Sequence, residues 1–147
     1  MGFDAQALKN WLVSRDVRLR PPADAQSVAQ LWQAFPDGVH PDVLSLYAAF
    51  DGTEDSDFEA ENFLTVWTIE QALTFPKERA IQGQLAIADV DWSCDVALCR
   101  VGEAGAPVEW WCDTLPDQSS FSEFWDVVMR GDLWRQPHHS FSRRKLK

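Results

Sequence analysis

The stretch that decides the fold is residues 36–67, PDGVHPDVLSLYAAFDGTEDSDFEAENFLTVW. Pro41 suits the first position of a helix, where its missing N–H has no partner to lose. The apolar positions that follow recur at i, i+3, i+4 and i+7, which is one helical face: Val43, Leu46, Tyr47 and Phe50. Gly52 comes next, and we expect it to be the left-handed cap at which this helix ends.

The second half of this stretch is crowded with carboxylates. Six of the eleven residues from Asp51 to Glu61 are acidic: Asp51, Glu54, Asp55, Asp57, Glu59 and Glu61. Such a segment repels itself and its charges cannot be buried unpaired, so we expect a surface loop. Phe63–Trp67 is then apolar on both alternating faces, which is typical of an interior strand that is covered on both sides.

The rest of the chain alternates between helical and extended patterns. Four further helices are predicted from apolar periodicity and from a capping residue before each: Asp4, Asp24, Thr68 and Ser120. We expect the helix after Thr68 to end before Pro76, and the last helix to place Phe121 and Trp125 in the core. Further strands are predicted at residues 85–88, 94–101 and 108–112, with 94–112 forming a hairpin.

This order predicts one α+β domain over residues 1–134, with a largely antiparallel sheet of about four to six strands packed against helices. Residues 135–147 follow as a basic tail with five Lys or Arg and no acid, which we expect to be a solvated terminus. The length of 147 residues is that of a single domain.

Charge, apolar content and cysteine content argue against nucleic-acid binding, a membrane span, a secretory signal and a disulfide-bonded protein. The net charge is −10, and direct nucleic-acid binding needs a basic face, so we expect none. No apolar run approaches a membrane span, and the first eleven residues are too polar for a secretory signal. Cys94, Cys99 and Cys112 have no metal-site spacing and an odd count, so we expect free thiols and a cytoplasmic location.

Several short motifs occur in a familiar order between Asp24 and Leu133. They are Phe35-Pro36, Asp51-Gly52, residues 64–73 (LTVWTIEQAL), residues 87–89 (IAD), residues 107–111 (PVEWW) and residues 120–125 (SFSEFW). In this the chain resembles the SUKH superfamily, the small domains related to fungal cell-wall-assembly regulators and common as bacterial immunity proteins. Asp89–Asp95 departs from the family pattern, because it lacks the glycines often found there.

The resemblance implies a non-enzymatic binding protein that neutralises a cognate toxin domain, often a nuclease, inside the producing cell. It offers no catalytic residue and no cofactor. From the residues themselves, we expect a basic protein partner, because clustered acid steers such partners. The predicted contacts are the six acids listed above together with Asp89, Asp91, Trp92 and Asp95.

Other interpretations remain open at this point. Asp55, Asp57 and Glu59 alternate as in a calcium loop, but Ala60 and Val66 stand where that loop has Gly and Glu, so we expect no metal. An adaptor in cell-wall or signalling control is a second interpretation. A small-ligand binder or enzyme is a third, and it requires a deep pocket with convergent polar groups and perturbed carboxylates.

The tryptophans also allow two interpretations each. Trp92 is either an exposed anchor or packed under its own loop. Trp110 and Trp111 should point to opposite faces of their strand, one into the core. We expect the other to be covered by a helix, the alternative being an exposed interface anchor. The sequence leaves the oligomeric state open.

Overall fold

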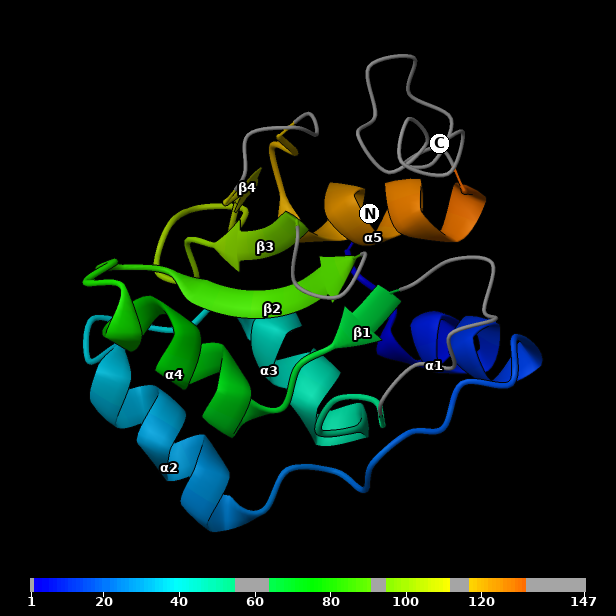
Figure 1. Ribbon diagram of the computed structural model, residues 1–147, viewed down its shortest axis with the longest axis horizontal. Helices are drawn as coiled ribbons and strands as arrows, with labels where there is room; N and C mark the ends of the chain where they lie inside the picture. The colour runs from blue at the N-terminus through cyan, green and yellow to red at the C-terminus, as the bar shows by residue number, and fades with distance from the viewer. Residues whose placement is uncertain (1, 55–63, 91–94, 112–116, 132–147) are drawn as a thin grey trace.

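The described part of the chain forms five helices and four strands, where the sequence supplies caps and apolar periodicity. The computed structural model describes residues 2–54, 64–90, 95–111 and 117–131 (Figure 1). The elements are α1 (Ala5–Ser14), α2 (Ala25–Ala34), α3 (Pro41–Ala49), β1 (Leu64–Val66), α4 (Ile69–Glu78), β2 (Leu85–Val90), β3 (Asp95–Cys99), β4 (Val108–Trp110) and α5 (Phe121–Arg130). The predicted α+β class is therefore confirmed.

The predicted capping residues begin four of the helices. Asp24 Oδ1 accepts a hydrogen bond from the Ser27 N–H (2.8 Å), which lowers the pKa of this carboxyl below its ordinary value. Thr68 and Gln71 form the predicted capping box, in which each side chain accepts from the other residue's N–H. Asp4 and Ser120 accept from backbone N–H groups in the same way.

Two helix ends differ from the prediction. The helix α3 ends at Ala49 and Phe50 is already extended, so Gly52 lies beyond the cap position that we expected it to occupy. The helix α4 runs through Pro76 instead of ending before it. Pro76 lacks a donor, but its carbonyl still accepts from the N–H groups of Arg79 (3.1 Å) and Ile81 (2.9 Å), which close the last turn.

The four strands form one antiparallel sheet in the order β1-β2-β3-β4. The predicted hairpin is present as β3 and β4, where Cys99 lies opposite Val108. Irregular segments pair with both outer strands: Thr53 bonds to Val66 beside β1, and Gln118 bonds to Val108 beside β4. This pairing occupies backbone groups that would otherwise make an exposed sheet edge.

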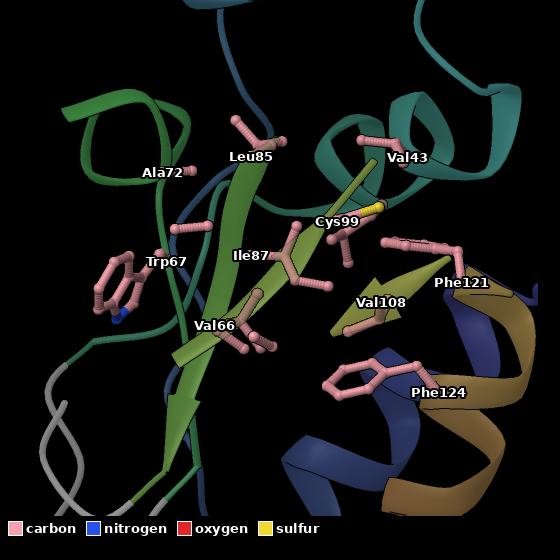
Figure 2. Packing of buried hydrophobic residues seen from close by; sticks show 14 of the residues in the cluster. Val43, Val66, Trp67, Ala72, Leu85, Ile87, Cys99, Val108, Phe121 and Phe124 are labelled. Carbon is pink, nitrogen blue, oxygen red and sulfur yellow. The ribbon is translucent and has the colours of Figure 1, made fainter. Parts of the chain in front are cut away.

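Helices cover both faces of the sheet. The helix α4 packs on β2, with α2 against its outer side (Figure 1). The helices α3 and α5 lie on the other face of the sheet (Figure 2), and α1 contacts both of them. In Figure 2, Phe121 and Phe124 of α5 lie on the same side of the sheet as Val108 and Cys99. Burial raises the pKa of the Cys99 thiol, which is free. Within the described ranges, no helix combines the length and apolarity needed to cross a bilayer.

Candidate functional site

The residues that border the predicted partner-binding segments lie at one end of the sheet. Leu64 lies opposite Val90, and Val90 lies opposite Asp95. The start of β1, the end of β2 and the start of β3 are therefore side by side at one end of the sheet. The Trp111 N–H donates to the Val96 carbonyl (2.8 Å), which places the end of β4 there too. We call this the acidic end, defined by Leu64, Val90, Asp95 and Trp111; β2 runs toward it from left to right in Figure 1.

The name reflects the charge of the segments attached there. Residues 54–63, 89–95 and 111–116 carry nine of the chain's 23 carboxylates and no Lys, Arg or His. Many of the predicted contacts fall outside the described residues, namely Asp55, Asp57, Glu59, Glu61, Asp91 and Trp92. The residues that border them are described, and they bring together two segments that are about 30 positions apart in the sequence.

The base of the acidic stretch is closed by hydrogen bonds. The Thr53 N–H donates to the Val66 carbonyl (2.8 Å), and the Val66 N–H donates to Thr53 Oγ1 (3.0 Å). On the other side, the Arg20 N–H donates to Gly52 (3.0 Å) and the Glu54 N–H donates to Arg18 (2.9 Å). Glu54, which is exposed, therefore lies beside β1, the strand that the chain enters at Leu64.

Arg18 and Arg20 are a feature that sequence reasoning missed. No Lys or Arg occurs between Arg20 and Lys77, so the acidic stretch has no base close to it in sequence. The tertiary structure nevertheless lays Arg18–Arg20 beside Gly52–Glu54, with Leu19 opposite Thr53. Leu19 and Thr53 are more than thirty positions apart, so no pattern of neighbouring residues could predict that they pair.

Asp51 has a structural role. Its Oδ1 accepts from the Ile69 N–H (2.9 Å) in the first turn of α4, and the side chain is half-buried. A carboxylate at this position satisfies an otherwise unpaired N–H and faces the positive end of the helix dipole. Asp51 therefore lies away from the acidic end and stabilises the start of α4.

Asp89 and Asp95 were predicted to contact a partner, and the structure contradicts this. The strand β2 continues past Ala88, and Asp89 pairs with Thr65 on one side and Val96 on the other. Asp95 is the first residue of β3. Their exposed fractions are 5% and 1%, so neither carboxylate presents a surface to a partner. The reason is register: pairing on both sides extends the sheet beyond the apolar run visible in the sequence.

An aromatic row on the α4 face of the sheet is the clearest described feature near the acidic end. The Trp111 ring is 5.7 Å from the Phe75 ring, and the Phe75 ring is 5.4 Å from that of Trp67. Trp110 is buried, as one of the pair was predicted to be, but Trp111 is 45% exposed. The preferred interpretation, in which a helix covers the second tryptophan, is therefore wrong. Phe75 of α4 contacts the Trp111 ring, but nearly half of the Trp111 surface remains exposed to solvent.

A groove of about 620 Å³ lies between the C-terminal halves of α2 and α4, near the beginning of β2 and thus at the other end of the sheet. Its apolar lining includes Leu73, Pro76 and Ile81, and its polar lining is Lys77 with the amides of Gln30, Gln33, Gln82 and Gln84. No carboxylate lines it among the described residues. The groove therefore lacks the perturbed carboxylates that the small-ligand interpretation requires.

Within residues 2–54, 64–90, 95–111 and 117–131, no group of three or more His, Cys, Asp or Glu side chains is placed to hold a metal ion.

Comparison with known proteins identifies no relative, since no protein-family model and no curated protein matches the chain.

Proposed function

We propose that this chain is a non-enzymatic protein-binding domain of the cytoplasm that recognises a basic protein through the acidic end. The observation that supports this is that residues 54–63, 89–95 and 111–116 all begin or end at one end of the sheet. They contain no base and nine carboxylates, seven of them besides the buried Asp89 and Asp95. A concentration of one sign of charge attracts a partner of the opposite sign and raises its association rate.

The scaffold suits this role. Irregular segments occupy the outer sides of β1 and β4, so neither strand offers its full edge for pairing with another chain. Helices cover both faces of the sheet. Recognition then falls to segments that the rigid sheet positions at its end, which is where proteins commonly place binding residues.

The identity of the partner rests on the resemblance to the SUKH superfamily. It suggests that the partner is a toxin domain, which this chain neutralises by binding. An adaptor in cell-wall or signalling control would use the same surface for a different partner. The two roles differ in one testable respect: a toxin should arrest growth of a host that lacks this chain, and co-expression of the chain should restore growth.

The charge hypothesis is tested by association kinetics. The partner is isolated from the native host by crosslinking and affinity capture, identified by mass spectrometry, and purified. A variant with E54Q, D55N, D57N and E59Q should associate about tenfold more slowly than wild type at low salt, because steering supplies that factor or more. The difference should disappear near 1 M salt, where the Debye length is about 3 Å.

A matched control changes the net charge by the same amount outside the segments of the acidic end. It carries D37N, E78Q, E103Q and D117N, all at exposed positions outside residues 54–63, 89–95 and 111–116. Glu78 and Glu103 make only exposed ion pairs, which contribute little to stability. Equal association rates for the two variants would show that overall charge, and not the acidic end, governs binding, and would contradict the proposal.

A further inference from the structure

Trp111 is the one large apolar side chain that the described structure leaves open at the acidic end. Its position is held from two sides. The Trp111 N–H donates to the Val96 carbonyl (2.8 Å), which extends the pairing of β4 with β3. The preceding Trp110 is buried, and its ring lies 5.7 Å from that of Phe124 on the opposite face.

The ring of Trp111 is also supported. It meets the Phe75 ring at 90°, and Phe75 is itself held by Trp67 and by Arg79, whose guanidinium lies 3.8 Å from the Phe75 ring centre. Arg79 Nη1 donates to the Phe75 carbonyl (3.3 Å) as well. Phe75 and Trp67 are each 9% exposed, so the ring that a partner can reach in this row is Trp111. A ring that is already ordered loses little entropy when it binds.

The surroundings select what this ring can bind. The segments that begin or end beside it, residues 111–116, 89–95 and 54–63, contain no base and seven carboxylates besides the buried Asp89 and Asp95, so a cation is attracted to this end. The indole ring is the best aromatic surface for a cation, and guanidinium groups stack on it more often than ammonium groups. Arg79 is placed on Phe75, which leaves Trp111 for a cation from outside.

We propose that Trp111 is the anchor of the interface and takes an arginine side chain of the basic partner on its exposed ring. This rests on the proposed function, because it names what that partner presents. The acidic segments then govern the association rate, and Trp111 governs the dissociation rate.

The first test uses a defined probe and needs no identified partner. A synthetic arginine-rich peptide is titrated into ¹⁵N-labelled protein at low salt, and an otherwise identical peptide with citrulline, which is neutral, serves as control. The Trp111 indole N–H signal, assigned with W111F, should shift with the arginine peptide only. Replacement by W111A should weaken binding about three- to tenfold, as loss of a cation–π contact does.

The outcomes separate the two proposals. Shifts confined to the backbone of Thr53, Glu54 and the following acidic residues, with Trp111 unmoved, would overturn the role of Trp111 and leave the charged partner-binding surface intact. No shift anywhere, or equal shifts with the citrulline peptide, would contradict both.

The second test uses the purified partner. W111A should raise the dissociation rate about tenfold or more and leave the association rate nearly unchanged. W32A is the matched control, because Trp32 is 43% exposed on α2, far from the acidic end in the fold. W111F keeps an aromatic ring against Phe75, so it remains informative if W111A proves unstable; it should raise the dissociation rate less than W111A. Dissociation of W111A at the same rate as W32A would contradict the proposal.

Discussion

Gly52 shows how one residue can be required by a contact that its neighbours in sequence do not reveal. Its φ is +81°, which favours glycine. A Cβ at this position would lie 2.7 Å from Thr68 N, 2.8 Å from the Val66 carbonyl oxygen and 2.9 Å from Trp67 C. Glycine therefore lets the start of the acidic stretch pack directly against the backbone that joins β1 to α4.

Replacing Gly52 by Ala should lower the free energy of unfolding by about 2–4 kcal/mol, since left-handed strain and overpacking each contribute. Denaturant unfolding measures this. Gly83 is the matched control, with a φ of +77° and no atom within 4 Å of its Cβ position. G83A should cost only the strain, about 1 kcal/mol. Equal losses for the two variants would show that the close approach of Gly52 is unimportant.

At the scale of an element, α5 carries the largest aromatic contribution to the core. Its apolar face is fully buried at Phe121, Phe124 and Trp125. The Trp125 ring lies 4.8 Å from Phe124 and 6.1 Å from Phe121, and Phe3 from the start of the chain packs on the same cluster. The Trp125 Nε1 is buried with no hydrogen-bond acceptor among the residues described, so its N–H stabilises nothing by hydrogen bonding.

Truncating this side chain should be costly. W125A should lower the free energy of unfolding by about 3–5 kcal/mol, as large aromatic truncations in cores do. W125F should cost less, because it keeps a ring and removes the unpaired N–H. W32A, on the exposed Trp32, should change stability by about 0.5 kcal/mol or less. Thermal or denaturant unfolding would count against this packing if W125A lost less than about 1 kcal/mol.

At the scale of the whole molecule, charge is distributed unevenly along the fold. The acidic end has no base in its attached segments, whereas Lys77 and Arg100 lie toward the other end. Arg100 there pairs with Glu109 (3.0 Å) and Glu103 (3.5 Å). Like charges that lie close together oppose the compact state, so the acidic end should reduce stability slightly.

Removing that repulsion should stabilise the protein. The variant with E54Q, D55N, D57N and E59Q should melt about 2–4 °C above wild type at low salt, which corresponds to about 1 kcal/mol in a domain of this size. Salt should raise the melting temperature of wild type more than that of the variant, because it screens the repulsion. A lower melting temperature for the variant, measured by calorimetry, would mean that these carboxylates stabilise the fold through favourable pairs.

The sequence by itself determined the features that depend on a few neighbouring residues. The starts of α1, α2, α4 and α5 followed from Asp4, Asp24, Thr68 and Ser120, because a cap acts on an N–H only two or three positions away. The β3–β4 hairpin and the α+β class followed from apolar alternation and a short loop in the same local way. The clustering of acids between Asp51 and Glu61 was visible directly.

Only the tertiary structure decided which of these residues meet. Asp51 caps a helix that begins 18 positions later, and Phe75 of α4 supports Trp111 at the end of β4. The burial of Asp89 and Asp95 depends on strand register. So does the position of Leu64, Val90, Asp95 and Trp111 side by side at one end of the sheet. Register and helix placement are set by contacts between residues far apart in sequence, and no local pattern of side chains contains that information.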